Sequence, residues 1–359
     1  MTLRDDPTQI TLSRSGPGAD RKPTMRDVAT LAGVSLRTVS RTINGDPTVS
    51  TEMSALVQNA IRLLEYRPNL TASNLRRADR KTATIGLVLE DVGNPFSSAL
   101  NRAIEDVARQ RGLLVFAGSS DQDPEREQEL LSSLMSRQVD GLIVVPAGSD
   151  HSALAIERQR WGMPVVFVDR PGSFLEADSV TSDNRAGARA AVSHLAAFGH
   201  RRIAFLGDQR TIWTAAERHA GYLEGLAAAG IAGDARLVRQ DVGGVAPAER
   251  AMLEMLALQK PPTAAFTGQN LITIGAVRAL RHADRQHRFA VVGFDDFELA
   301  DLLDPAISVV AQNVAALGRE AAEMLLARID GDIGPSRHLV LPVSLLVRGS
   351  GEIPASSHF

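Results

Sequence analysis

Two kinds of hydrophobic pattern divide the chain. From residue 24 to residue 64, apolar residues recur every three or four positions, which is typical of amphipathic helices. From residue 82 to about residue 350, short runs rich in Val, Ile and Leu alternate with longer amphipathic stretches. Such alternation predicts parallel strands that are covered by helices on both faces. The sequence therefore predicts a small helical domain followed by a doubly wound α/β fold.

The second region supplies most of the predicted elements. The predicted strands cover residues 84–89, 113–117, 141–145, 165–168, 202–206, 263–267, 289–292 and 308–310. The predicted helices include residues 97–111, 125–137, 186–198 and 272–282. Sheets of this kind bind ligands beyond the carboxyl ends of their strands, so we expect a binding site in the loops at those ends.

Residues 24–44, TMRDVATLAGVSLRTVSRTIN, predict two short helices joined at Gly33. Thr24 and Asp27 form a capping-box-like pair at the start of the first helix, and a left-handed Gly33 can end it. Ser35 can cap the second helix. This layout is typical of a helix-turn-helix that places its second helix in the DNA major groove, whereas a helical bundle with a solvated basic face is the structural alternative. The second helix directs outward Leu36, Arg37, Ser40, Arg41 and Asn44.

A short basic segment follows this region. Pro68 suits the first turn of a helix, and residues 69–77 could form about two turns, a length that is marginal for an isolated helix. Leu75 stands among arginines at positions 76, 77 and 80. An apolar side chain in that setting suits a wedge in the DNA minor groove, and a charged linker with one stray leucine is the alternative.

Basic residues are concentrated near the amino terminus. Residues 21–81 contain 11 Lys/Arg and 5 Asp/Glu, a net +6. The whole chain has a net charge of −3, so the rest of it carries −9. A basic head on an acidic body fits phosphate binding that is confined to one end of the chain.

Length and composition narrow the class of protein. The 359 residues suffice for one small and two medium domains. The absence of cysteine excludes disulfides and thiolate metal sites, and no apolar run is long enough for a transmembrane helix. Residues 1–22 lack the apolar core of a secretory signal, and we expect either a disordered tail or a start codon assigned too far upstream.

No catalytic constellation is visible in the sequence. The 8 histidines show neither metal-ligand spacing nor a nucleophile partner. The glycine motifs that bind dinucleotides or phosphates do not occur. We therefore expect no enzyme, and we predict no catalytic residue, metal or cofactor.

Polar residues gather in the loops after the predicted strands. They combine carboxylates and amides for hydroxyl groups, an arginine fork and aromatic rings, which is the mixture that a sugar or sugar-acid pocket needs. Three structural alternatives are open, because Arg218 and Asp295 can pair with each other, Trp213 can serve packing alone, and Asn94 with Pro95 can form a turn. We expect structural roles for Asp183, Asn184 and Asp296. The predicted ligand contacts are Asn94, Phe96, Asp169, Arg170, Trp213, Arg218, Gln269 and Asp295.

The segments MRDVATLAGVSLRTVSRTING and YRPNLTASNL resemble the lactose/galactose-repressor (LacI) family of bacterial transcription regulators, and the resemblance continues to about Arg348. It implies that Leu36, Arg37 and Arg41 face base edges in the major groove. It also implies that Ala72 and Leu75 lie in the minor groove. Contacts near the DNA backbone, or support for the docking, are implied for Thr24, Met25, Ser35, Ser40, Asn44, Thr48 and Ser50.

The same resemblance implies a core of two sub-domains, like a periplasmic sugar-binding protein, with an effector in the cleft between them. It matches Phe96, Arg218, Gln269 and Asp295 to effector-contacting positions. We expect a helix-turn-helix domain at 23–67, a hinge helix and linker at 68–81, an effector-binding and dimerisation domain at 82–350, and a tail at 351–359. The sub-domains would comprise 82–180 with 312–339 and 181–311 with 340–350, with crossings near Thr181, Ala311 and Leu339.

These observations together predict a cytoplasmic, nucleoid-associated homodimer that a small sugar or sugar acid releases from a palindromic operator. Many family members carry Asn-Asp where this chain has Gln269-Asn270, and loss of that carboxylate favours an effector with its own negative charge. A regulator controlled by a protein partner or co-repressor is the main alternative. A secreted solute-binding protein would need a signal sequence and no basic head, and an enzyme would need a reactive constellation.

Overall fold

The computed structural model describes residues 21–43, 45–67, 81–148 and 150–355. The chain divides into two compact units, residues 1–80 and residues 81–359. Three predicted DNA contacts, Asn44, Ala72 and Leu75, lie outside the described residues. Within the described residues, no helix is both long enough and apolar enough to cross a membrane.

The first unit contains three helices, α1 (Met25–Ala32), α2 (Leu36–Ile43) and α3 (Thr51–Leu63). They pack around a small core in which Val28, Val39 and Val57 are fully buried. One buried residue from each helix therefore meets the other two helices, and the polar faces of the helices are left at the surface.

Local hydrogen bonds fix where the first two helices begin and end. The backbone N–H and the hydroxyl of Thr24 both donate to the Asp27 carboxylate, at 2.7 Å each. Gly33 ends α1 with φ of 66°, a left-handed conformation that glycine adopts without strain. The Ser35 hydroxyl accepts from the Thr38 backbone N–H at 3.1 Å and so caps α2. The short turn between α1 and α2 is thus specified by the sequence itself.

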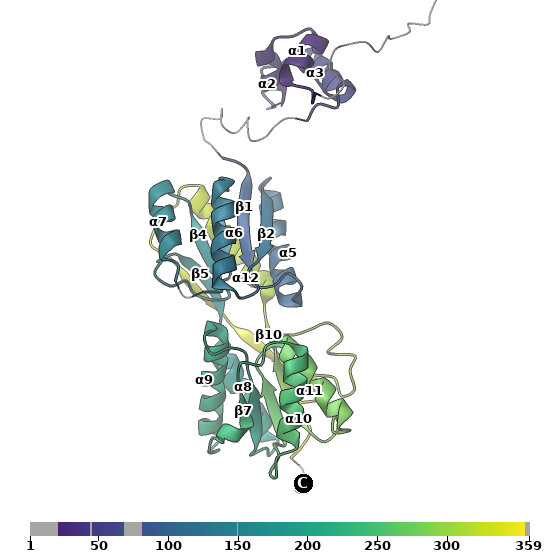
Figure 1. Ribbon diagram of the computed structural model, residues 1–359, viewed down its shortest axis with the longest axis vertical. Helices are drawn as coiled ribbons and strands as arrows, with labels where there is room; N and C mark the ends of the chain where they lie inside the picture. Colours follow the sequence, from purple (N-terminus) through teal and green to yellow (C-terminus); the bar gives the residue numbers. More distant parts are fainter. Residues whose placement is uncertain (1–20, 44, 68–80, 149, 356–359) are drawn as a thin grey trace, which may run out of the picture. The chain divides into compact units, whose positions relative to one another are not determined.

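The second unit contains two six-stranded sheets, and each sheet is the centre of one lobe (Figure 1). The strands are β1 (Thr84–Leu89), β2 (Leu114–Ser119), β3 (Leu142–Val144), β4 (Val165–Val168), β5 (Asp178–Ser182), β6 (Ile203–Leu206), β7 (Val238–Arg239), β8 (Ala264–Thr267), β9 (Ala290–Phe294), β10 (Ser308–Gln312), β11 (His338–Leu341) and β12 (Val343–Leu346). The first lobe has the order β11-β5-β4-β3-β1-β2, and the second has β12-β10-β9-β8-β6-β7. The described pairs are parallel except β10 with β12.

Helices cover both faces of each sheet, as the continuous apolar strands predict. The helices of the first lobe are α5 (Pro95–Gln110), α6 (Pro124–Ser136), α7 (Ser152–Trp161) and α12 (Val314–Ile329). Those of the second lobe are α8 (Asn184–Ala197), α9 (Trp213–Ala228), α10 (Val245–Leu256) and α11 (Asn270–His282), with a short 3₁₀ turn η1 (Ala235–Leu237). The pairs α5 with α12 and α6 with α7 pack on opposite faces of the first sheet, and α8 with α9 and α10 with α11 do so on the second.

The chain passes between the lobes three times, after β5, after β10 and after β11. The first two passages lie at Asp183 and Asn313, whose side chains accept from the backbone N–H three residues later, at 3.0 Å each. Each passage is therefore also the N-cap of a helix in the next lobe. The third lies at Pro342. The crossings thus fall two or three residues beyond the predicted Thr181, Ala311 and Leu339.

Strand β5 was not expected from the sequence, because its residues, DSVTS, are mostly polar. All five positions are nevertheless buried. The Asp178 carboxylate accepts from the Arg328 guanidinium at 2.8 and 2.9 Å, and the Ser179 hydroxyl lies 2.8 Å from His338 Nδ1. Tertiary partners for its polar groups therefore permit a buried strand that hydrophobic patterning does not reveal. The unexpected β7, β11 and β12 are short or half-exposed.

The carboxyl-terminal segment was expected to be a tail from residue 351, but residues 350–355 pack on the second lobe. The Ser350 hydroxyl donates to the Val291 carbonyl at 2.6 Å and accepts from the Ser308 backbone N–H at 2.8 Å. Ile353 packs against the lobe core, and its carbonyl lies 2.8 Å from Nε2 of the buried His200. The polar composition of this segment therefore reflects hydrogen bonding to the lobe.

Two glycines of α9 allow it to approach α8 closely. A Cβ on Gly221 would lie 2.2 Å from the Arg185 carbonyl oxygen, and a Cβ on Gly225 would lie 2.7 Å from Val192 Cβ. We predict that Gly221→Ala lowers the free energy of unfolding by about 1–3 kcal/mol, because the two helices must separate. Urea denaturation followed by circular dichroism measures this change. Gly233→Ala is the control, since a Cβ there meets no atom within 4 Å, and equal stability of the two variants would contradict the prediction.

Candidate functional site

Helix α2 presents the side chains that the sequence assigns to the major groove. Leu36 is 40% exposed, and Arg37 is also exposed and makes no hydrogen bond or ion pair with any described residue. Arg41 differs, because its Nε donates to Asp46 Oδ2 at 2.9 Å. The side chain of Ser40 is partly exposed. The outer face of α2 therefore carries one unrestrained arginine and one arginine held by a carboxylate.

Four of the described residues predicted to support docking lie at helix starts of the first unit, whereas Ser40 lies within α2 and Thr48 in the turn before α3. Thr24 and Met25 begin α1, and Ser35 caps α2. The Ser50 hydroxyl accepts from the Met53 backbone N–H at 3.3 Å and caps α3. The Thr48 backbone N–H donates to Asp46 at 2.9 Å. Their roles toward DNA remain predictions.

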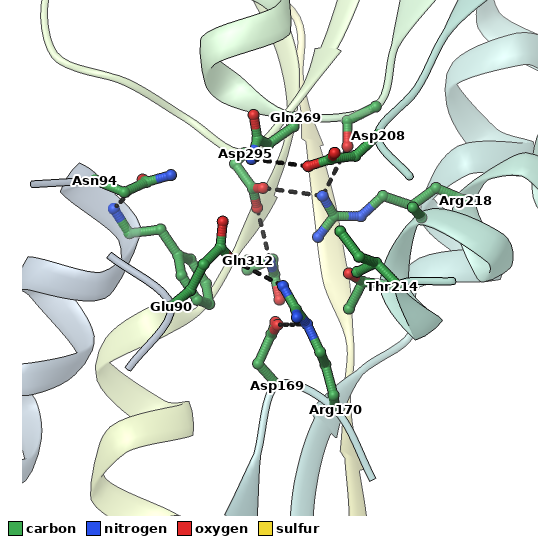
Figure 2. Close-up of a pocket in the computed structure, with 14 residues that line it drawn as sticks. Glu90, Asn94, Asp169, Arg170, Asp208, Thr214, Arg218, Gln269, Asp295 and Gln312 are labelled. Carbon is green, nitrogen blue, oxygen red and sulfur yellow. Dashed lines mark hydrogen bonds and ion pairs between the residues drawn. The ribbon is translucent and has the colours of Figure 1, made fainter. Parts of the chain in front are cut away.

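A cleft lies between the two lobes of the second unit and is lined by polar side chains from both (Figure 2). Most of the polar side chains follow the carboxyl end of a strand, the place where parallel sheets bind ligands. The lining residues of the first lobe are Glu90, Asn94, Phe96, Asp169 and Arg170. The second lobe and the β10 passage supply Asp208, Ile212, Thr214, Ala215, Arg218, Gly268, Gln269, Asp295 and Gln312.

Arg170 organises the first-lobe wall of the cleft. Its Nη2 donates to Glu90 Oε2 at 2.8 Å, and its Nη1 donates to the Pro146 carbonyl at 2.9 Å. Its Nε lies 3.4 Å from Asp169 Oδ2. The guanidinium thus bridges the ends of three neighbouring strands, β1, β3 and β4, and fixes the two carboxylates beside it.

Arg218 organises the second-lobe wall in the same manner. Its Nε donates to Asn184 Oδ1 at 2.7 Å, and its Nη1 donates to the Gly268 carbonyl at 2.8 Å and to Asp295 Oδ2 at 3.1 Å. The guanidinium also lies 3.9 Å from the centre of the Phe294 ring. The expected pairing of Arg218 with Asp295 therefore occurs within the cleft wall, and no described residue accepts from Nη2.

Asp169 is the most perturbed carboxyl of the cleft. Burial raises its pKa to about 6, with Asp295 and Glu90 adding to the rise, while Arg170 and Arg218 act against it. Asp169 Oδ1 is buried and accepts no hydrogen bond within the described residues. Two further buried acceptors of the lining, Gln269 Oε1 and Gln312 Oε1, also lack a donor there. Arg170 Nε, a buried donor of the same lining, has no hydrogen-bond acceptor there either, so the cleft contains both acceptors and a donor that its own residues do not satisfy.

Seven of the eight predicted ligand contacts line the cleft, and Trp213 does not; its neighbours Ile212 and Thr214 do. Asn94 lines the cleft but also binds across it, since the Asn270 amide donates to Asn94 Oδ1 at 3.0 Å. Asn184 and Asp296 have structural partners, Arg218 and Arg348, and Asp183 caps α8.

Several residues that line the cleft were not among the predicted ligand contacts. Glu90 and Asp208 follow β1 and β6, so they could have been predicted from the rule that ligands bind beyond the carboxyl ends of strands. Gln312 is the last residue of β10, and its side-chain amide donates to Asp295 at 2.6 Å. Its place in the cleft follows only from where the chain passes between the lobes. Among the residues that the structure describes, no cluster of three or more His, Asp or Glu side chains could hold a metal ion.

Each of the two units matches a known protein family. Residues 24–69 match the model for bacterial regulatory proteins of the lacI family, and residues 192–351 match a periplasmic binding protein-like domain. Both matches confirm the predicted fold class, a helix-turn-helix followed by a doubly wound two-lobe core.

Similar curated proteins are transcription regulators. The chain is 32% identical over 338 residues to the HTH-type transcriptional regulator GalR of Escherichia coli, covering 92% of this chain and 96% of GalR. It is 32% identical over 333 residues to the ribose operon repressor of Escherichia coli, covering 91% of this chain and 99% of that repressor.

Solved structures show the same architecture. A lac repressor dimer bound to operator and the anti-inducer ONPF matches with a TM-score of 0.80 and 27% identity, over 92% of this chain and 99% of that one. A complex of the transcriptional regulator CelR with cellobiose matches with a TM-score of 0.68 and 32% identity, over 91% and 99%. The chain therefore belongs to the lacI family of bacterial regulatory proteins and is a DNA-binding transcriptional repressor rather than an enzyme.

Proposed function

We propose that the protein is a homodimer that represses a sugar-utilisation operon in the cytoplasm by binding a palindromic operator, and that a small neutral sugar in the cleft releases it. The single observation that carries the effector assignment is the set of buried acceptors without donors around the cleft. Hydroxyl groups donate as well as accept, so a polyol can satisfy these acceptors and the guanidinium edges together.

The charge of the cleft argues for a neutral ligand. Four carboxyl side chains line it, Glu90, Asp169, Asp208 and Asp295, against the guanidinium groups of Arg170 and Arg218. A sugar acid was expected because the chain has Gln269-Asn270 in place of a carboxylate. Asn270, however, is turned toward Asn94 and is not among the lining residues. A further negative charge would therefore be placed among carboxyls that are already in excess.

The DNA-binding half of the proposal rests on α2 and on the net charge of +6 between residues 21 and 81. A lac repressor dimer bound to operator is similar over nearly the whole chain, which supports a dimer that reads two half-sites.

Two experiments test the proposal. Selection from random duplex DNA should enrich a palindrome, and a thermal-shift panel of neutral sugars and sugar acids should give a stabilising neutral sugar. Selection of no palindrome would overturn the proposed palindromic operator, and stabilisation by sugar acids alone would overturn the neutral effector.

The pair of Arg218 with Asp295 should be required for the response to effector. We predict that Asp295→Asn weakens binding of the stabilising sugar at least about tenfold, because an amide N–H₂ would face either the Arg218 or the Gln312 donor. Isothermal titration measures this change. The matched control is Asp296→Asn, whose side chain binds Arg348 at 2.7 Å. Equal sugar affinity of the two variants would contradict the assignment.

The raised pKa of Asp169 predicts a pH-dependent stability. In the folded protein Asp169 keeps its proton up to about pH 6, whereas the unfolded chain loses it above the ordinary pKa of 3.8. The contribution of Asp169 to the unfolding free energy therefore falls as the pH rises from about 4 to about 6. Asp169→Asn removes that dependence. We predict that the unfolding free energy of the wild type falls by up to about 3 kcal/mol relative to the variant over this range. Urea denaturation at both ends of the range measures it, and a constant difference would contradict the burial effect.

A further inference from the structure

Asp46 is an acidic residue placed beside the surface that we propose for DNA. It stands in the turn after α2, and its two carboxylate oxygens have different partners. Oδ1 accepts from the backbone N–H and the hydroxyl of Thr48, at 2.9 and 2.5 Å. Oδ2 accepts from Arg41 Nε at 2.9 Å. The Asp46 backbone N–H also donates to the Arg41 carbonyl at 3.0 Å, so the turn and the arginine are held by the same residue.

This arrangement restricts how Arg41 can be used. The hydrogen bond turns the Nε edge of the guanidinium toward Asp46, while Nη1 and Nη2 have no partner among the described residues. Two parallel donors at the outer edge match O6 and N7 of guanine, the commonest base contact of arginine. Arg37, one turn earlier, has no such restraint. The two arginines of α2 are therefore not equivalent before DNA is bound.

A negatively charged side chain such as Asp46 is unusual on a surface that binds DNA. A carboxylate near phosphates opposes the sequence-independent attraction that lysine and arginine supply. Hydrogen bonds from Thr48 and the guanidinium of Arg41 hold the pKa of Asp46 well below its ordinary range, so the side chain is ionised at neutral pH. Part of the positive charge of Arg41 is thereby offset, which weakens its attraction to phosphate and leaves its directional hydrogen bonds.

We propose that Asp46 is a positioning residue for sequence specificity: it holds Arg41 with its outer edge toward one guanine of each operator half-site and keeps that guanidinium off the phosphates. This inference rests on the proposed operator binding through α2. It assigns to Asp46 an effect on which base is chosen, separate from any effect on folding of the turn.

Selection from random duplex DNA, followed by affinity measurements over a range of salt concentrations, tests this role in the full-length protein. The variant is Asp46→Asn, which keeps an oxygen for the Thr48 backbone N–H and loses the charge that binds Arg41. We expect the preference for guanine at one position of each half-site to fall about tenfold. Non-specific binding should become tighter, with a salt slope steeper by about one. A turn that merely unfolds would weaken both specific and non-specific binding.

Two further variants complete the test. Glu65→Gln removes the same charge from an exposed residue after α3 and should leave every base preference unchanged. Arg41→Lys should lose the same guanine position, and the double variant Asp46→Asn with Arg41→Lys should lose no more than Arg41→Lys alone. An unchanged guanine preference in Asp46→Asn would overturn the role of Asp46 while leaving operator binding intact. Failure of the wild type to select a palindrome would instead overturn the proposed function.

Discussion

Arg218 is 5% exposed, and a buried cation must be both neutralised and hydrogen-bonded. The chain meets this constraint by bringing Asn184, Gly268 and Asp295 to it from the start of α8 and the ends of β8 and β9. Asp295 in turn binds Gln312, the last residue of β10. Asn184 directly follows the first passage between the lobes, and Gln312 directly precedes the second. A ligand that alters the bonds of Arg218 or Asp295 therefore acts on two of the three passages.

The two lobes repeat one another, and the repeat explains why polar groups meet in the cleft. The strand orders correspond position by position, and β4 and β9 occupy the same place in their sheets. Asp169 and Asp295 follow these strands, both with positive φ, at 68° and 66°. Each donates its backbone N–H to the next strand at 2.9 Å, to Val180 and Val310. Left-handed conformations are uncommon for residues other than glycine, and aspartate tolerates them better than most residues. The lobes differ in that Asp295 has partners for both oxygens, whereas Asp169 Oδ1 has none within the described residues.

The features that could be predicted from the sequence are those determined by local patterns. The capping pair of Thr24 with Asp27, the left-handed Gly33 and the apolar runs of the parallel strands all correspond to observed elements. The rule that ligands bind at strand ends predicted seven of the fourteen residues that line the cleft. What could not be predicted depends on long-range partners. The polar strand β5 needs Arg328, and the carboxyl-terminal segment needs the hydrogen bonds of Glu352 with Ser308 and of Ile353 with His200. Likewise, nothing in the local sequence shows that Asp46 holds Arg41 or that Asn270 binds Asn94.

In the proposed function, binding of sugar in the cleft and binding of operator by the first unit are linked. Linkage requires that two sites coupled in this manner affect each other by the same factor. The most direct measurement is the affinity of the stabilising sugar for the free protein and for its complex with a selected operator duplex, by isothermal titration. We expect operator to weaken sugar binding by about 5–150-fold, the same factor by which sugar weakens operator binding. Equal sugar affinity in the two states would contradict it.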